Sequence, residues 1–241
     1  MIQLYHGGPA GHSASVLMAL AEKGLDYESR PLDLAAFDQH GDAFLAINPD
    51  GQVPVLDVDG RRLGETFFIL LYLDERYPLP ALGGNDPKAR YNVQKWGKYV
   101  ETHIAPNVAI MDWAQRGNAP DSARNGFGRL TPERRALWEK AAAGFGEDEV
   151  ESARAALVKA AGRIAEDLAT GAWLTGDNYT LADIIVFPHA ARFADLGIDV
   201  PDSVTGWLER VRARPHVRDA LGGDGTGSPA ATMGPEKGRW G

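Results

Sequence analysis

Hydrophobic positions follow one pattern in the first third of the chain and another in the rest. Up to about residue 80, short apolar runs alternate with helical segments and with turns rich in glycine and proline. Residues 2–5 and 25–32 are predicted as strands. Residues 13–23 form good helix sequence with Gly24 just past its end, the usual stop signal, and residues 37–47 are predicted as a short helix.

A hairpin and a helix complete this first part. Residues 53–64 are predicted as a hairpin with the two-residue turn Asp59-Gly60, and residues 65–77 as an amphipathic helix. Pro54 lies inside the first hairpin strand, where proline removes a hydrogen-bond donor from the sheet. We therefore expect an edge position, a bulge or a cis bond at Pro54. The predicted order is a βαβ unit, a helix and a ββα unit.

Strand signals nearly vanish in the second part of the chain. Residues 181–196 are apolar on most sides, as expected of a buried central helix. Three further helical stretches are predicted, over residues 88–116 with a bend at Pro106, over 132–169 with a break at 144–146, and over 203–214 with a stop at Pro215.

The two patterns divide the chain into an α/β part and an all-helical part. The length of 241 residues is enough for two small domains, each with its own core. We predict an α/β domain over residues 1–79, a linker over 80–87, an all-helical domain over 88–221 and a Gly/Pro-rich tail over 222–241.

Composition removes several classes of function. The net charge of −8 makes nucleic acid and membrane surfaces poor partners, because both are anionic. The absence of cysteine excludes disulfides, Cys-ligated zinc and every mechanism that uses a protein thiol. The six histidines are scattered without an H-x-x-x-H pair, so no metal site is expected. Without a signal peptide or a long apolar stretch, the expected compartment is the cytoplasm.

Four segments in this order resemble the cytosolic glutathione S-transferases over about residues 1–221. They are LYHGGPAGHSASVLMALAEKGLDYE (4–28), INPDGQVPVLDVDG (47–60), Gly64-Glu65-Thr66 and Tyr179-Thr180-Leu181-Ala182-Asp183. The resemblance implies a thioredoxin-like domain that binds glutathione as co-substrate, and a helical domain that binds an electrophile. It also implies a dimer, either of identical chains or with a related chain.

A finer resemblance points to the bacterial β-etherases, which use glutathione to cleave β-aryl ether bonds of lignin fragments. It is carried by LYHGGPAGHS (4–13), Phe37-Asp38-Gln39-His40 and ARNGF (123–127). It implies that the glutathione thiolate displaces an aryloxy group next to a carbonyl in a small aromatic ketone. Two alternatives stay open, namely a general detoxifying or dehalogenating transferase and a non-catalytic glutathione-binding subunit. Redox chemistry of the glutaredoxin or omega type is excluded, since it needs a cysteine.

Ser13 and His12 are the candidate catalytic residues. A free thiol has a pKa of about 8.5, so the site must stabilise the thiolate with donors and a positive potential. Ser13 lies at the start of the first helix, where its hydroxyl and backbone N–H groups can point at an anion, although a helix cap is the alternative. His12 is either a second donor or a solvated loop residue. Tyr5 is the rival, as some classes use a tyrosine there, and Ser15 is weaker.

The remaining glutathione contacts follow from the resemblance. The Val53-Pro54 bond would be cis and would present the Val53 backbone to the ligand. Thr66 would donate to the γ-glutamyl carboxylate, and Glu65 would meet the ammonium or only complement the helix dipole. His40 and Gln52 would contact the glycyl end and the peptide backbone, with a surface role as the alternative for His40.

The electrophile pocket is expected beside the first helix of the second domain. Its candidate lining residues are Tyr99, His103, Asn107, Met111 and Trp113, each of which is also a typical core residue. The Arg124–Phe127 segment would close over the pocket. Thr180 and Asp183 are expected to form a structural capping box instead.

Overall fold

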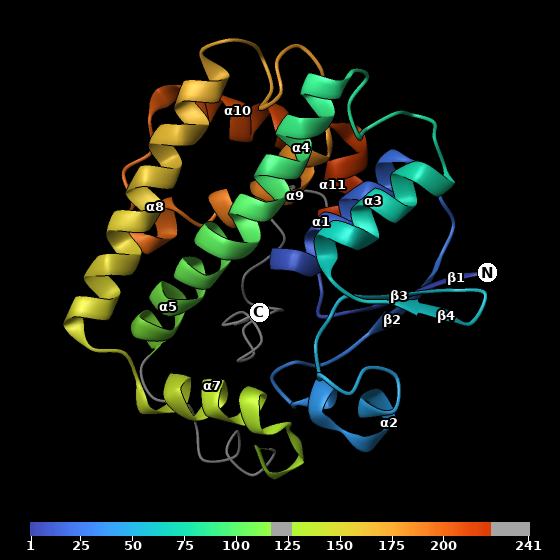
Figure 1. Ribbon diagram of the computed structural model, residues 1–241, viewed down its shortest axis with the longest axis vertical. Coiled ribbons are helices and arrows are strands. Elements are labelled where there is room, and N and C mark those ends of the chain that lie inside the picture. The colour runs from blue at the N-terminus through green and yellow to red at the C-terminus, as the bar shows by residue number, and fades with distance from the viewer. Residues whose placement is uncertain (117–126, 223–241) are drawn as a thin grey trace.

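The computed structural model describes residues 1–116 and 127–222 and contains a small α/β domain beside a helical domain (Figure 1). Four strands form one mixed sheet in the order β2-β1-β3-β4. They are β1 (Ile2–His6), β2 (Glu28–Pro31), β3 (Val55–Val58) and β4 (Arg61–Leu63). β1 runs parallel to β2 and antiparallel to β3, which pairs antiparallel with β4.

The sheet separates two apolar layers because strand side chains alternate between its faces. Ile2 and Leu4 of β1 pack into the main core with the helices α1 (Gly11–Glu22) and α3 (Thr66–Arg76). Tyr5 packs on the other face against Phe44. That face is covered by the 3-10 turn η1 (Asp38–His40) and the short helix α2 (Asp42–Leu45). The predicted thioredoxin-like arrangement is confirmed.

Helices make up the second domain, in which α4 and α5 follow one another as one long rod and α8 runs beside α5 (Figure 1). The described elements are α4 (Pro87–Tyr99), η2 (Val100–Ile104), α5 (Ala105–Arg116), η3 (Phe127–Arg129), α7 (Pro132–Ala143), α8 (Glu147–Leu168), α9 (Leu181–Ala190), η4 (Ala194–Leu196), α10 (Asp202–Arg212) and α11 (Pro215–Leu221). The predicted all-helical domain is confirmed, and so is the break at residues 144–146.

Three sequence expectations need correction. The helix predicted over 37–47 is split into η1 and α2, with Phe37 before it in a left-handed conformation. The long helix over 88–116 is not simply bent, because η2 is a π-helical turn just before Pro106. The helix predicted over 203–214 does end before Pro215, as α10 at Arg212, but Pro215 then begins α11, a separate helix that was not predicted, since proline fits the first turn of a helix, where its missing N–H has no partner.

The buried helix α9 lies at the centre of the molecule, as predicted, and all ten of its residues are buried. Its first turn carries the expected capping box, in which Thr180 caps the helix and the Asp183 carboxylate accepts from the Thr180 N–H at 2.9 Å. Asp183 also accepts from the Trp207 indole at 2.9 Å. Burial outweighs these hydrogen bonds and raises the pKa of Asp183 to about 6. The structural role predicted for this pair is confirmed.

Candidate active site

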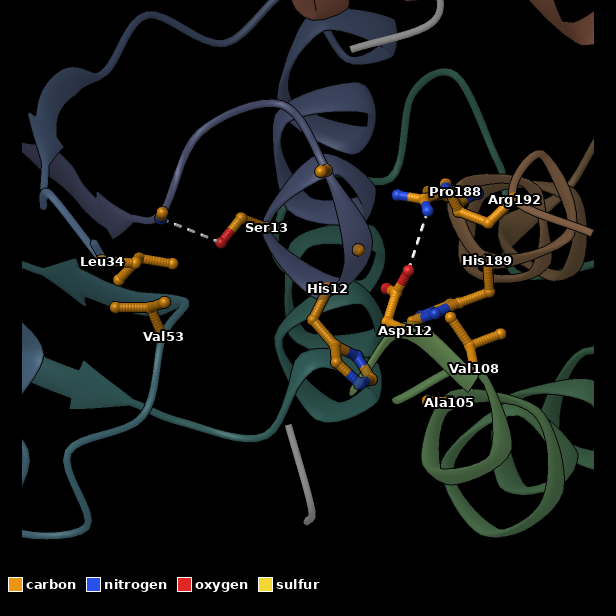
Figure 2. Close-up of a pocket in the computed structure, with 13 residues that line it drawn as sticks. His12, Ser13, Leu34, Val53, Ala105, Val108, Asp112, Pro188, His189 and Arg192 are labelled. Carbon is orange, nitrogen blue, oxygen red and sulfur yellow. Dashed lines mark hydrogen bonds and ion pairs between the residues drawn. The ribbon is translucent and has the colours of Figure 1, made fainter. Parts of the chain in front are cut away.

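A cleft lies between the two domains, beside the first turn of α1 (Figure 2). Its empty volume is about 580 Å³ with the open solvent at its mouth included, and only about 50 Å³ of its interior can hold the centre of a water-sized molecule, so the cleft is narrow. The lining residues come from the β1–α1 loop, α1, two loops of the α/β domain, α5 and α9, and are Gly7, Ala10, Gly11, His12, Ser13, Leu34, Val53, Ala105, Val108, Asp112, Pro188, His189 and Arg192.

Ser13 is the third residue of α1 and lines the cleft from the first turn of this helix. Its hydroxyl oxygen accepts a hydrogen bond from the Gly7 N–H at 3.1 Å, and the side chain is buried. The N-cap of α1 is Ala10, without a side-chain hydrogen bond, so Ser13 is not the helix cap. Gly7 has no room for a side chain, because a Cβ there would lie 2.1 Å from Leu34 Cδ1. The loop is therefore held close to Ser13.

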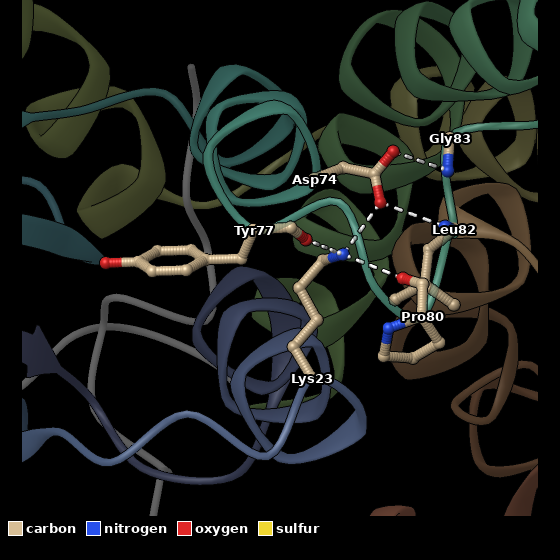
Figure 3. A network of polar contacts seen from close by, with 6 residues as sticks. All are labelled: Lys23, Asp74, Tyr77, Pro80, Leu82 and Gly83. Atoms are coloured by element: carbon tan, nitrogen blue, oxygen red, sulfur yellow. Dashed lines mark hydrogen bonds and ion pairs between the residues drawn. The ribbon is translucent and has the colours of Figure 1, made fainter.

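The far end of α1 is anchored to α3 and to the connection between the two domains (Figure 3). The fully buried Lys23 ammonium donates to Asp74 at 2.8 Å and to the carbonyls of Tyr77 and Pro80 at 2.8 and 2.9 Å. Asp74 also accepts from the backbone N–H groups of Leu82 and Gly83, in the connection between the domains.

A second anchor lies at the same end of α1. Glu22 accepts two hydrogen bonds from Arg214, at 2.6 and 2.8 Å, across 192 residues of chain. The helix that carries Ser13 also packs directly on α9 and α11. α1 is therefore fixed to both domains.

The other candidates for thiolate stabilisation divide into two groups. His12 lines the cleft, and its ring packs edge-on against His189 with centroids 4.7 Å apart. Tyr5 lies outside the cleft lining, on the opposite face of the sheet, with its ring 6.0 Å from that of Phe44. Ser15 is fully buried within α1.

Val53 forms the cleft wall on the side of the α/β domain. The Val53-Pro54 bond is cis, as the resemblance implied. The loop before it is held by the Asn48 side-chain amide, which donates to the Gln52 carbonyl at 2.8 Å. Gln52 itself is half-buried next to Val53, outside the cleft lining.

Glu65 and Thr66 stand at the start of α3, also outside the cleft lining. Glu65 is exposed and has a positive φ of 59°, a conformation that costs backbone strain in a residue other than glycine. Thr66 is the first helical residue and is buried.

His40 is buried beneath α7, not on the surface. Its ring packs edge-on against Trp138 with centroids 5.2 Å apart. Burial and the nearby Arg134 guanidinium lower the pKa of His40 to about 4, so the imidazole is neutral at pH 7. It abuts Gly51, two positions before Val53.

The predicted electrophile-pocket residues of the second domain lie away from the cleft. Tyr99 stacks on His103 with centroids 4.7 Å apart, under the Arg163 guanidinium. The Asn107 amide donates to the His103 carbonyl, Met111 belongs to the main core, and Trp113 packs in a separate cluster with Trp138. Of the Arg124–Phe127 segment, only Phe127 is among the described residues, and it joins the Trp138 cluster.

From α5, the cleft is lined instead by Ala105, Val108 and Asp112. Val108 and Asp112 each lie one position after a residue that was predicted to line the pocket, namely Asn107 and Met111. A π-helical turn inserts one extra residue into a helix. Because η2 lies just before α5, it rotates the face that a straight helix would present.

Sequence reasoning missed three polar residues of the cleft, Asp112, His189 and Arg192. Arg192 Nη2 donates to Asp112 Oδ1 at 2.8 Å, and its Nε lies 3.3 Å from Asp195 Oδ2. A signal was present, because His189 and Arg192 are two of the four polar residues in the mainly apolar run of residues 181–196, the others being Asp183 and Asp195. A polar side chain on a buried helix usually has a specific partner or ligand.

Among the described residues, the structure contains neither a membrane-spanning helix nor a metal-binding group. In residues 1–116 and 127–222, no helix combines the length and apolar character needed to cross a bilayer. The same residues contain no group of three carboxylate or imidazole side chains placed to hold a metal ion.

Comparisons with known proteins agree with this geometry. Residues 1–75 match the glutathione S-transferase N-terminal domain and residues 127–215 the C-terminal domain. Protein LigF of Sphingobium sp. (strain NBRC 103272 / SYK-6) is 30% identical, over 90% of this chain and 92% of its own. Maleylacetoacetate isomerase of Pseudomonas aeruginosa is 29% identical, over 95% of this chain and 100% of its own.

Solved structures show the same architecture. The crystal structure of the β-etherase LigF from Sphingobium sp. strain SYK-6 aligns with a TM-score of 0.82 at 29% identity, covering 91% of this chain and 98% of that one. Both domain models and a relative matched over nearly its full length agree with the cleft between a thioredoxin-like and a helical domain. The chain belongs to the glutathione S-transferase family.

Proposed function

We propose that the protein is a glutathione transferase that cleaves β-aryl ether bonds of lignin-derived aromatic ketones. The observation that carries the proposal is the position of Ser13, whose hydroxyl lies in the first turn of α1 on the cleft wall, opposite the Val53 backbone. The first N–H groups of a helix lack intrahelical partners and favour an anion. A glutathione thiolate placed there would have both the hydroxyl and these groups as donors.

The glutathione tripeptide would extend from this point over the α/β domain. The backbone of Val53, before the cis bond, would pair with its peptide groups, and Gln52 and His40 would lie toward its glycyl end. Glu65 and Thr66 at the start of α3 would receive the γ-glutamyl group. His12 would stand on the electrophile side of the sulfur, against His189.

The reaction is a displacement at carbon. The thiolate sulfur forms a bond to the carbon that carries the aryloxy group, next to the ketone. The carbon–oxygen bond breaks and its electron pair leaves with the phenol oxygen, which takes a proton from solvent. Holding both reactants in one cleft supplies orientation, and donors supply electrostatic stabilisation.

The substrate class is supported by the lining and by one relative. Leu34, Val53, Ala105, Val108 and Pro188 give apolar surface suited to an aromatic ring. The β-etherase LigF of Sphingobium sp. strain SYK-6 matches over most of both chains. The maleylacetoacetate isomerases of Pseudomonas aeruginosa and Rattus norvegicus, at similar identity, make isomerisation of maleylacetoacetate the second candidate. The charged Arg192 in the cleft favours this candidate, as it suits a carboxylate ligand.

The test is mass spectrometry of the protein incubated with glutathione and a racemic β-aryl ether ketone. Formation of both the free phenol and the glutathione thioether supports the proposal, and consumption of one enantiomer gives the stereochemistry. Conjugation of chlorodinitrobenzene without ether cleavage would contradict it and indicate a detoxifying transferase. Turnover of maleylacetoacetate alone would establish the isomerase, and glutathione binding without any turnover would indicate a non-catalytic subunit.

We also propose that the protein forms a dimer through the outer faces of α3 and α4, with a heterodimer as the alternative. These helices carry Phe68 and Tyr91, whose side chains are 64% and 66% exposed, and such exposure of large apolar groups is typical of an interface. Light scattering of the wild type and of Phe68→Glu tests this, because a charge there should yield the monomer.

A further inference from the structure

The cleft wall that faces α1 contains polar groups to which the proposed function gives no role. The buried Asp112 of α5 and the half-buried Arg192, just after α9, form an ion pair at 2.8 Å. The rest of this wall is mainly apolar, with Ala105, Val108 and Pro188. An ion pair in an apolar cleft costs desolvation energy, so its presence calls for a chemical reason.

The direction of the displacement supplies a reason. A nucleophile attacks carbon in line with the bond that breaks, so the leaving atom departs on the side opposite the nucleophile. With the sulfur held beside Ser13 at α1, the leaving oxygen would face the wall formed by α5 and α9. Figure 2 shows Ser13 on one side of the first turn of α1, and Asp112, His189 and Arg192 on the other.

The leaving group of an aryl ether is the kind that needs a donor. A phenol has a pKa of about 10, like tyrosine, so its anion leaves carbon much less readily than chloride does. A guanidinium stays charged and carries five N–H donors in one plane. Two of its nitrogen atoms, Nη2 and Nε, face Asp112 and Asp195. The hydrogen bond from Nη2 to Asp112 orients the guanidinium, whereas Nε makes only an ion-pair contact with Asp195 and no hydrogen bond. Nη1 lies on the other edge of the guanidinium.

We propose that Arg192 is a catalytic residue that donates a hydrogen bond to the departing aryloxide oxygen, and that Asp112 is the positioning residue that orients it. The inference rests on the proposed function. In this step the sulfur–carbon bond forms, the carbon–oxygen bond breaks, and the electron pair moves onto the oxygen facing Arg192. Arg192 keeps its proton, and the released phenolate is protonated by solvent.

The test uses β-aryl ether ketones that differ only in the leaving phenol, from methoxyphenol through phenol to nitrophenol. In Arg192→Met, kcat/KM should fall about a hundredfold for methoxyphenol ethers, the usual loss for one oxyanion donor. It should fall less than about threefold for nitrophenol ethers and for chlorodinitrobenzene, whose leaving groups need little help. The ratio of the kcat/KM values for two substrates, measured on one preparation, does not depend on how much of the variant is folded.

Three further variants sharpen the result. Arg192→Lys should recover part of the rate for poor leaving groups. Asp112→Asn should make kcat/KM depend more steeply on the pKa of the leaving phenol, but less so than Arg192→Met does. It should leave the KM for glutathione unchanged. Arg210→Met is the matched control, because Arg210 is exposed and donates to the Ala172 carbonyl on α10's outer side, and its dependence should equal that of the wild type.

The outcomes separate the two proposals. If the wild type cleaves the ethers and Arg192→Met loses the same factor with every leaving group, Arg192 only shapes the cleft and the inference is overturned. If the wild type cleaves none of the ethers, the proposed function fails and the inference fails with it. A loss confined to poor leaving groups supports both.

Discussion

Two largely buried ion pairs, each with one buried partner, join segments that are far apart in the chain, and they differ in how many of their N–H donors have acceptors within the protein. Lys23 has three N–H donors, and all three have acceptors within the protein, in Asp74, Tyr77 and Pro80 (Figure 3). Arg192 has five donors and faces its carboxylates with two of its three nitrogens, at the wall of a cleft (Figure 2). An ion pair whose N–H donors all have acceptors within the protein stabilises the fold, whereas an ion pair with further N–H donors at the wall of a cleft can also bind a ligand.

Lys23→Met should therefore have the largest effect on stability. It leaves Asp74 without its ammonium partner, and removing one member of a buried pair costs about 3 to 5 kcal/mol in the free energy of unfolding. Urea unfolding measures this loss. Lys95→Met is the control, because its pair with Asp167 is partly exposed and contributes less than about 1 kcal/mol. Equal losses in the two variants would remove the distinction.

Asp183 extends the comparison to a buried carboxylate without a cation. Its folded pKa of about 6 lies above the unfolded value of 3.8, so the folded state binds the proton more tightly. Its contribution to stability is full below pH 4 and is lost as pH rises to 6, by about 3 kcal/mol. Asp183→Asn cannot titrate. The wild type should lose that much relative to Asp183→Asn between pH 4 and pH 7 in urea unfolding, and parallel profiles would contradict it.

Ser13→Ala should show the opposite signature, a change in rate with little change in stability. Removal of one thiolate donor is expected to lower kcat/KM with chlorodinitrobenzene about a hundredfold. It should also raise the pKa of bound glutathione, measured by ultraviolet titration. Ser15→Ala, two residues along the same helix and fully buried, should leave both quantities near wild type. A larger effect of Ser15→Ala than of Ser13→Ala would assign thiolate stabilisation to Ser15 and contradict the role proposed for Ser13.

His40→Gln gives the smallest expected effect. The folded pKa of about 4 lies below the unfolded value of 6.5, because burial and Arg134 disfavour the charged form. The contribution is full above pH 6.5 and is lost as pH falls through 4, by about 3 kcal/mol in all, of which about 2 kcal/mol is lost between pH 7 and pH 4.5. The wild type should therefore lose stability on acidification relative to His40→Gln, in contrast to Asp183. Thermal unfolding at pH 4.5 and 7 measures the difference.

Local patterns predicted the fold well. The short apolar run of β1, the hairpin of β3 and β4, the cis bond at Val53-Pro54 and the capping box at Thr180 each depend on a few neighbouring residues, or on a motif that the family resemblance supplied. Period and turn chemistry are local properties, so they are visible in one sequence.

The cleft was harder to predict, because its geometry depends on phase and on distant contacts. One π-helical turn before Pro106 changed which face of α5 lines the cleft. His40 became buried because Trp138, almost a hundred residues later, covers it. The pairing of Asp112 with Arg192 likewise spans 80 residues. A single sequence gives no direct signal for such distances.

The ion pair between Glu22 and Arg214 affects the order in which the chain can fold while it is being synthesised. Chains grow from the N-terminus at about 5 to 20 residues per second. The Glu22 side chain, 3% exposed in the finished protein, must therefore wait about 10 to 40 seconds for a partner 192 residues later. The helix that bears Ser13 emerges from the ribosome early, yet its packing is completed among the last steps.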